Sequence, residues 1–211
     1  MIGLIHHQSF LKHDTEFPHP HFESFESPER LNTVYTYLRK KEMFDHPKIT
    51  PFLAKPINED ELYKLHAPYL VETVKNLSNV GEGEIGAHTY ASRDAFEVAQ
   101  LAVGGVILAC EEVLKGTVNH AFALIRPPGH HAGYSKTEGL CIFNNCACAV
   151  KVLQKKNKLD RALIIDFDSH YGDGIAEFFY SDPSVLYISL HELFNKSEKG
   201  SIFELLSLIH I

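Results

Sequence analysis

The 211-residue sequence has little of what marks a nucleic-acid-binding protein. Its 20 basic and 27 acidic residues give a formal net charge of −7, and no long run of one charge occurs. Binding to a phosphate backbone needs a clustered basic surface, so we expect no direct nucleic-acid binding. The short basic stretches at 39–41 and 155–158 are typical of solvated helix ends.

Membrane and export signals are missing too. The longest apolar stretch, residues 101–110, is far shorter than the roughly 20 residues that cross a bilayer. No basic segment followed by a long apolar segment opens the chain, which argues against a signal peptide. We therefore expect a cytoplasmic protein that does not bind membranes.

Cysteine is scarce, and none of the four cysteines belongs to a CxxC pair, so a zinc-ribbon site is not expected. Their apolar or small neighbours predict buried free thiols, as in a reducing compartment. Histidine, by contrast, is abundant, with 14 residues, and it suits both metal binding and proton transfer near neutral pH. The cysteines are Cys110, Cys141, Cys146 and Cys148.

The local signals predict an α/β protein. A hydrophobic content of 45% and a charged content of 22% suit one soluble domain, or the larger part of one. Short apolar runs alternate with helical segments in the second half, which indicates a parallel sheet with helices on its faces. The predicted strands are 1–5, 121–125, 162–165 and 185–190. The predicted helices are 28–42, one starting at 58–61 with Glu61 in a capping box, 92–115, 144–154 and 174–180, with loops at 13–28 and 81–86.

Polar residues follow three of these strands directly. Residues 126–131 come after the first strand of the second half, residues 166–170 after the second, and His191 with Glu192 after the third. Ligands of open parallel sheets bind at the carboxyl ends of the strands. The pattern therefore predicts an active site where these three strand ends meet.

The segment Asp166-Phe167-Asp168-Ser169-His170 has the donors of a metal site. Alternate side chains of an extended segment share a face, so Asp168 and His170 can bind one ion together. Oxygen and nitrogen donors suit Zn²⁺, with Fe²⁺ as the alternative. Asp166 lies at the strand end, where it is placed to orient a histidine. A capped strand end with solvated acids is the competing interpretation.

The adjacent histidines His130 and His131 favour catalysis over that interpretation. They follow a strand in a turn made by two prolines and a glycine, where packing histidines are uncommon. Each ring can donate its N–H to a nearby carboxylate, and Asp173 is placed to orient the second. A histidine beside a metal-activated water can take its proton, a step worth roughly 10²–10⁴ in rate.

Three segments resemble a known family: FALIRPPGHHA at 122–132, GLCIFNN at 139–145 and IDFDSHYGDG at 165–174. They are similar to the histone deacetylase superfamily, which includes acetylpolyamine amidohydrolases and acetoin-utilisation proteins. Residues 27–30, 62–70 and 185–192 resemble it as well, so the resemblance spans roughly residues 1–193. We expect residues 194–211 to be a divergent tail, foreign to the family.

The resemblance implies a fold and a set of roles. The fold would be the three-layer arginase–deacetylase α/β fold with a mostly parallel central sheet, incomplete at its C-terminal side. The activity would be zinc-dependent removal of acetyl or other acyl groups from an acetylated lysine of a protein or from a small acetylated amine. Asp168 and His170 would bind zinc, His131 with Asp173 would be the general base, and His130 would pair with Asp166. Gly139 and Leu140 would line the substrate tunnel, and Asp166, Asp168, His170, Ser189 and Leu190 would hold a structural K⁺.

The sequence departs from the family pattern at three points. Leu140 stands where phenylalanine is usual, and His88 stands near the position of an acid at the rim of the site. The family's third zinc ligand, an aspartate, and its tyrosine that polarises the substrate carbonyl have no counterpart after His170. We therefore expect weak or absent deacetylase activity from these 211 residues. A metal-binding or interaction module is the alternative, whereas a manganese ureohydrolase would need more bridging aspartates.

Overall fold

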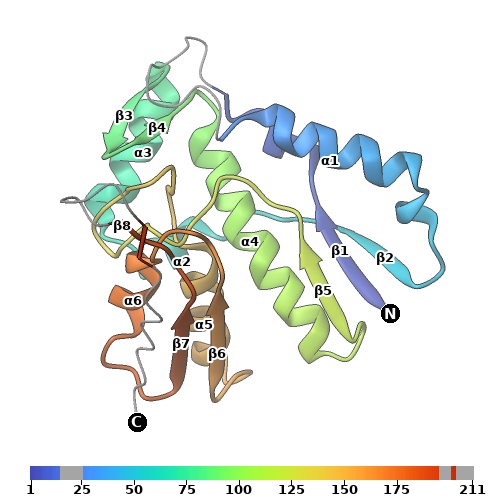
Figure 1. The fold of residues 1–211 in the computed structure, drawn as a ribbon. Helices are drawn as coiled ribbons and strands as arrows, with labels where there is room; N and C mark the ends of the chain where they lie inside the picture. The colour runs from blue at the N-terminus through green and yellow to red at the C-terminus, as the bar shows by residue number, and fades with distance from the viewer. Residues whose placement is uncertain (15–25, 195–200, 203–211) are drawn as a thin grey trace.

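Two short parallel sheets form the centre of the computed structural model, which describes residues 1–14, 26–194 and 201–202 (Figure 1). The first sheet has the order β2-β1-β5, made of β2 (Ile49–Leu53), β1 (Ile2–His6) and β5 (His120–Ala123). The second pairs β6 (Ala162–Asp166) with β7 (Val185–Ser189). The predicted α/β class and parallel pairing are confirmed. Within the described residues β5 and β6 do not pair, so these parallel strands fall into two sheets.

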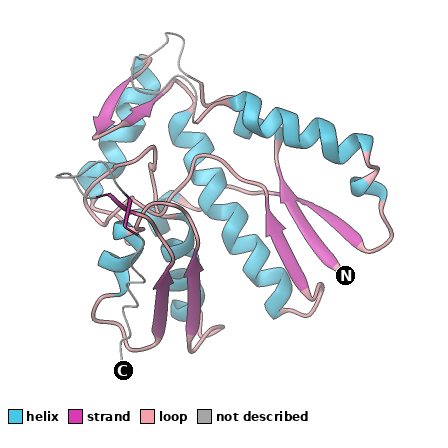
Figure 2. Ribbon diagram, viewed as in Figure 1, coloured by secondary structure: helices cyan, strands magenta, loops and turns pink. Residues whose placement is uncertain are grey.

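Helices cover these sheets and connect them (Figure 2). The 20-residue helix α4 (Ala95–Leu114) packs on β1 and β5 and also on α5 (Asn145–Lys155), so it joins the two halves of the molecule. Its apolar sequence predicts a buried helix, and most of its inner residues are buried. The remaining helices are α1 (Pro28–Lys40), α2 (Glu59–Leu62), α3 (Pro68–Val80) and α6 (Asp173–Phe179), with the short 3₁₀ helices η1 (Gln8–Leu11) and η2 (Met43–Asp45).

Local capping explains where several helices begin and end. The Asn144 side chain accepts a hydrogen bond from the Ala147 amide at 3.0 Å and so caps α5. Asn58 does the same for α2. Gly116 ends α4 with a φ of +75°, a conformation that glycine adopts without steric cost. Ser27 has the extended backbone of an N-cap, but its side chain makes no capping hydrogen bond.

Other local predictions need correction. The expected loop at 81–86 contains β3 (Gly83–Gly86), which forms a hairpin with β4 (Thr89–Ala91). The Glu61 carboxylate forms ion pairs with Lys64 at 3.0 Å and Lys155 at 3.3 Å, and among the described residues it makes no capping-box hydrogen bond. Cys146 is exposed, whereas Cys141 and Cys148 are buried as predicted.

Two predicted regions fall largely outside the described residues. Most of the expected loop at 13–28 lies there, as does most of the expected tail at 194–211, apart from the short hairpin of β8 (Leu193–Phe194) and β9 (Ser201–Ile202). Among the described helices, none has the length and apolar character that crossing a membrane requires.

Candidate active site

The histidine loop, residues 126–133, follows β5 and is anchored at its start by Arg126. The Arg126 side chain is buried, donates to the Phe10 carbonyl at 2.9 Å and forms an ion pair with the buried carboxylate of Glu26 at 2.5 Å. Burial raises the pKa of Glu26, and this effect outweighs the opposing charge of Arg126. The two charges are therefore desolvated partners that hold the loop against the N-terminal part of the chain.

Buried amides and an imidazole hold the rest of the histidine loop. Asn145 donates to the Pro127 carbonyl at 3.0 Å, and Asn144 donates to the Ala132 carbonyl at 2.9 Å. The fully buried His66 ring donates from Nδ1 to the Gly133 carbonyl, while its Nε2 accepts from the Asn144 amide. Burial lowers the pKa of His66 to about 4, so the ring is neutral and makes both bonds at neutral pH.

His130 forms the first histidine–carboxylate pair. Its Nδ1 lies 3.0 Å from Asp166 Oδ2, and a carboxylate only accepts, so the ring donates. The Tyr187 hydroxyl donates to the same carboxylate oxygen at 3.0 Å. Burial acts to lower the pKa of His130, but the hydrogen bond and charge of Asp166 raise it above its ordinary value. A Cβ on Gly172 would come within 2.4 Å of Asp166 Oδ2 and of the Tyr187 hydroxyl, so a larger residue there would displace these side chains.

His131 forms the second pair, with Asp173 at the start of α6. Its Nδ1 lies 2.7 Å from Asp173 Oδ1, and the other oxygen of Asp173 accepts from Lys136 Nζ at 2.5 Å. Burial acts to raise the pKa of Asp173, but the hydrogen bonds from His131 and Lys136 lower it to about 2. The carboxylate therefore stays ionised and fixes which ring nitrogen of His131 carries its proton.

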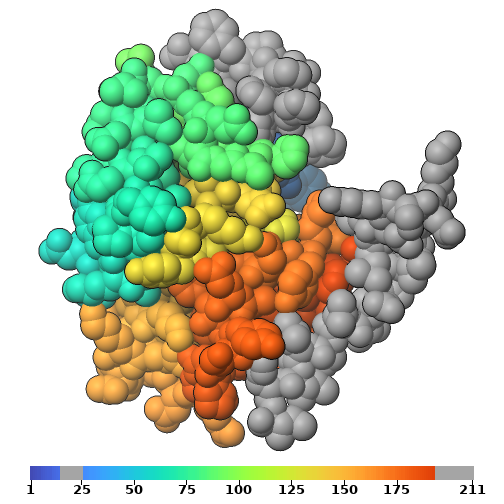
Figure 3. Space-filling model, turned by 90° about the vertical axis from the view of Figure 1, so that its left-hand side faces the viewer, coloured from blue at the N-terminus to red at the C-terminus, as the bar shows by residue number. Residues whose placement is uncertain are grey.

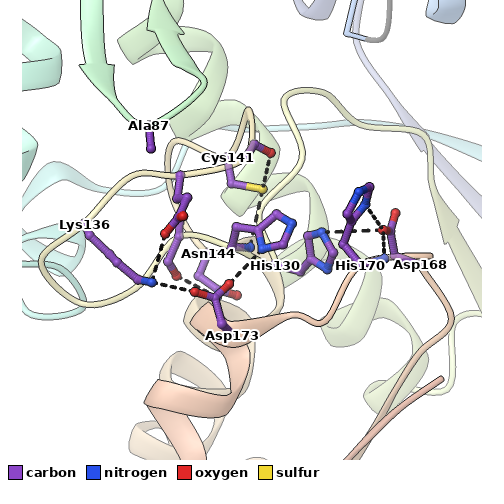
Figure 4. Close-up of polar contacts among 12 residues, drawn as sticks. Ala87, His130, Lys136, Cys141, Asn144, Asp168, His170 and Asp173 are labelled. Atoms are coloured by element: carbon purple, nitrogen blue, oxygen red, sulfur yellow. Dashed lines mark hydrogen bonds and ion pairs between the residues drawn. The ribbon is translucent and has the colours of Figure 1, made fainter. Parts of the chain in front are cut away.

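Asp168 and His170 lie beside these pairs on the donor loop, residues 167–170, which follows β6. Their side chains point toward one another, with His130 close by (Figure 4). Asp168 Oδ1 is 3.0 Å from His170 Nδ1 and 3.9 Å from His130 Nε2. Both side chains are about half exposed, at 49% and 57%. The structure thus gathers the predicted oxygen and nitrogen donors at one place.

The predicted tunnel residues gather on the other side of His131. Leu140 donates its backbone N–H to the His88 carbonyl at 3.0 Å, which joins the 139–140 turn to the β3–β4 hairpin. Gly139 has a φ of +56°, and a Cβ there would overlap the His131 ring. His88 and Leu140 also have positive φ values. In Figure 3, the yellow segment that contains the 139–140 turn lies at the surface between the teal segment of α3 and the orange segment of α6.

The residues after β7 lie next to the Asp166 end of β6. Ser189 is the register partner of Asp166, and the Leu190 amide donates to the Asp166 carbonyl at 2.8 Å. The predicted K⁺-binding residues are thus neighbours. His191 is buried, bonded to Ser189 at 2.9 Å and packed on Tyr171, so it does not face the histidine pairs.

Three residues near the site were not predicted from the sequence. Lys136 holds Asp173, Tyr187 holds Asp166, and His66 holds the histidine loop. Each residue is separated from its partner by 21 to 67 positions in the sequence, so local spacing of residues does not predict these contacts. His66 and Tyr187 fall in segments that resemble the family, which is the one clue to their importance.

Comparison with known proteins finds related sequences over most of the chain. Residues 24–199 match the histone deacetylase domain family. Histone deacetylase HDA1 of Candida albicans is 35% identical over 196 residues, 84% of this chain and 23% of that protein. Polyamine deacetylase HDAC10 of Mus musculus is 34% identical over 210 residues, 97% and 30% of the two chains. A probable deacetylase of Archaeoglobus fulgidus is 36% identical over 191 residues, 90% and 51%.

Comparison with solved structures also finds a related deacetylase-type domain. The crystal structure of the HDA15 HD domain superposes with a TM-score of 0.80 at 34% identity, covering 90% of this chain and 53% of that one. The predicted arginase–deacetylase fold is thereby confirmed. The chain spans between 23% and 51% of the length of the three related proteins above. On the match over residues 24–199 and these similarities, the chain belongs to the histone deacetylase family.

Proposed function

We propose that this chain carries the proton-transfer residues and two metal ligands of a zinc-dependent deacetylase. The reaction would be hydrolysis of an N-acetyl or other acyl amide on a protein lysine or on a polyamine-type amine. The observation that supports it is the pair of histidine–carboxylate contacts, His130–Asp166 and His131–Asp173, beside Asp168 and His170. The names of the related proteins, which include histone and polyamine deacetylases, favour this substrate class.

The donor pair suits zinc. Asp168 Oδ1 and His170 Nδ1 lie at a hydrogen-bond distance of 3.0 Å, and carboxylate oxygen and imidazole nitrogen are both donor types that zinc binds. Over residues 1–14, 26–194 and 201–202, no three His, Cys, Asp or Glu side chains gather to hold a metal ion. Catalytic zinc sites usually have three protein ligands, so Asp168 and His170 would supply two of them and one more protein ligand would be needed. Zinc would supply Lewis-acid chemistry there, polarising the amide carbonyl and acidifying water.

The histidine pairs would move the protons. Asp173 accepts from Nδ1 of His131, which leaves Nε2 to take a proton from the attacking water and later to deliver it to the leaving amine. Asp166 orients His130 in the same way, and the raised pKa of His130 favours its protonated form. Gly139, Leu140 and His88 would form the wall of the acyl tunnel. A structural K⁺ beside Asp166 and Ser189 belongs to the same proposal.

A metal-binding or interaction module without catalysis is the second candidate. The observation in its favour is the shortage of metal ligands within the described ranges, where Asp168 and His170 stand as a pair. Such a module would bind zinc through the donor loop and would leave acetylated amines unchanged.

Two measurements on the full chain separate these functions. Zinc affinity is measured by competition with a chelating dye, and acetate release is measured with an acetyl-lysine peptide and with N-acetylspermidine. We expect zinc-dependent, slow acetate release that falls by roughly 10²–10⁴ in His131→Ala. The exposed His120→Ala is the matched control and should keep the parent rate. Zinc binding without any acetate release would favour the module, and absence of both would refute both functions.

A further inference from the structure

The ammonium group of Lys136 lies between two carboxylates beside the second histidine pair. Its Nζ donates to Asp173 Oδ2 at 2.5 Å and to Glu138 Oε2 at 3.1 Å. The other oxygen of Asp173 accepts from His131 Nδ1 at 2.7 Å, so the lysine and the histidine bind different oxygens of one carboxylate. Figure 4 shows Lys136 reaching Asp173 from the side away from His170. A chain of polar contacts thus runs from Glu138 to the His131 ring.

Lys136 belongs to a loop whose backbone is fixed by its neighbours. The Gly133 amide donates to the Lys136 carbonyl at 3.0 Å, which closes a turn at the end of the histidine loop. The buried Thr137 donates from its hydroxyl to the Ile85 carbonyl on β3 at 2.6 Å. A Cβ on Gly86 would come within 2.1 Å of the Thr137 carbonyl oxygen, so β3 and this loop are in close contact. The Lys136 side chain therefore starts from a defined point.

The carboxylate of Asp173 needs a second partner to keep one orientation. Asp173 is the first residue of α6, which fixes its backbone but leaves the carboxylate free to turn about its side-chain torsions. The side chain is 33% exposed, so water competes with His131 for the carboxylate. A cation on the second oxygen opposes that rotation, because turning the group would break a charge-assisted hydrogen bond. Lys136 is such a cation, and its position matches this task.

We propose that Lys136 is a positioning residue, which holds the carboxylate of Asp173 against the ring of His131. Glu138 fixes the Lys136 side chain in turn. The catalytic importance of Lys136 rests on the proposed function, in which His131 is the base. Asp173 must accept from Nδ1 of that ring for Nε2 to be left for the proton of the attacking water. A carboxylate that turned away would leave the ring free to carry its proton on either nitrogen.

A solvated ion pair without a role is the competing explanation. Exposed pairs contribute little, because water competes for both charges and the long lysine side chain loses freedom. Lys136 differs from such a pair, since it bridges two carboxylates from an anchored backbone. The hydrogen bond to Asp173 raises the pKa of Lys136, so the bridge stays charged near neutral pH. Lys158 is an ordinary pair for comparison: it is 41% exposed and contacts Glu111 near the end of α4.

The test measures the His131–Asp173 hydrogen bond in the zinc-free full chain, where no activity is needed. The ring N–H signal of His131 in the ¹⁵N-labelled protein, assigned by its loss in His131→Gln, reports that bond through its exchange with water. Lys136→Met should accelerate the exchange at least about tenfold, whereas Lys136→Arg, which keeps the charge and the donors, should stay within about threefold of the parent. Lys158→Met is the matched control and should leave the exchange unchanged.

A kinetic readout connects this hydrogen bond to catalysis. With the acetyl-lysine peptide and zinc, Lys136→Met should lower kcat roughly tenfold and change KM less than about twofold, because Lys136 orients the base and does not hold the substrate. Lys136→Arg should recover most of the rate. If the parent chain releases no acetate, the proposed function fails, and the ring exchange in the zinc-free chain still decides the role of Lys136.

Each outcome of the exchange experiment has a definite meaning. Melting temperatures within about 2 °C of the parent are expected for all three lysine variants, because the replaced side chains are partly exposed. Unchanged ring exchange in Lys136→Met overturns the proposal. Equal acceleration in Lys136→Met and Lys158→Met also overturns it, because the effect would then be a general consequence of losing an ion pair. Equal acceleration in Lys136→Met and Lys136→Arg has the same result, since charge and donors would then not matter.

Discussion

The histidine loop and the donor loop reach the same end of the fold, yet the chain holds them in different ways. The histidine loop is fixed by Arg126 at its start, by Asn145 in its middle and by Asn144 and His66 at its end. All four side chains are buried. The donor loop is held mainly by its own turn, in which the His170 amide donates to Asp168, and by the Glu192 amide.

This difference follows from where each loop lies in the fold. The buried partners of the histidine loop come from η1, the segment before α1, the start of α5 and the segment before α3. The donor loop lies at the surface, where Phe167 and His170 are exposed. The proposed proton-transfer half of the site is therefore held by buried side chains, whereas the proposed metal-binding half is exposed to solvent. Changes to the first should damage the fold, and changes to the second should not.

The largest effect is expected from Arg126→Met. It leaves the Glu26 carboxylate buried without its charged partner and removes a donor from the Phe10 carbonyl. Breaking one partner of a buried ion pair typically costs about 3–5 kcal/mol of unfolding free energy. Urea unfolding measures it, with the exposed Arg161→Met as the control. Adding Glu26→Gln should recover part of the loss, and a loss below 1 kcal/mol would mean that the pair does not anchor the loop.

Acidification should weaken the same anchor through His66. The pKa of His66 is about 4 in the folded protein, against 6.5 for an ordinary histidine, because the ring is buried. Between these values only the unfolded chain takes up the proton, so the stability due to His66 is complete above pH 6.5 and is lost as the pH falls toward 4. The loss should reach about 3 kcal/mol.

Urea unfolding at pH 7 and pH 5 in the parent chain and in His66→Gln tests this dependence. The variant should be less stable at pH 7 and should lose less on acidification, whereas the exposed His120→Gln should follow the parent. If His66→Gln shows the full acid dependence of the parent chain, the neutral-ring interpretation is wrong.

A smaller effect is expected from Tyr187→Phe. The ring stays buried, but Asp166 loses one of the donors to the oxygen that accepts from His130. One hydrogen bond to a charged group contributes about 1.5–3 kcal/mol, and the remaining donors should reduce the loss to about 1 kcal/mol. Tyr37→Phe is the control, because Tyr37 is 58% exposed. Equal stability of the two variants would show that β7 does not support the His130–Asp166 pair.

The sequence predicts one of these two loops better than the other. The His130–His131 pair and the alternation from Asp166 to His170 are local patterns, and both segments follow strands as the patterns predict, whereas His191 after β7 is buried away from the histidine pairs. The anchors are long-range contacts: Arg126 meets Glu26 across 100 residues, and His66 meets Gly133 across 67. Helical and strand periodicity does not report such contacts. The separation of β5 from β6 escaped prediction for the same reason, because strand patterns do not specify pairing partners.

The smallest effect on stability is expected where the chemistry is most exposed. Asp168→Ala removes the acceptor of the His170 amide and the contact with the His170 ring, but both residues are about half exposed and water can replace these bonds. We expect the free energy of unfolding to change by less than about 0.5 kcal/mol. Zinc affinity, measured by dye competition, should nevertheless fall more than about tenfold. Asp160→Ala, at another exposed aspartate, should change neither quantity.

A large loss of stability in Asp168→Ala would erase the contrast between the loops, because the donor loop would then be part of the folded framework. Unchanged stability with lost zinc binding would instead show that Asp168 contributes to zinc binding and not to folding, as expected for a residue on an exposed loop.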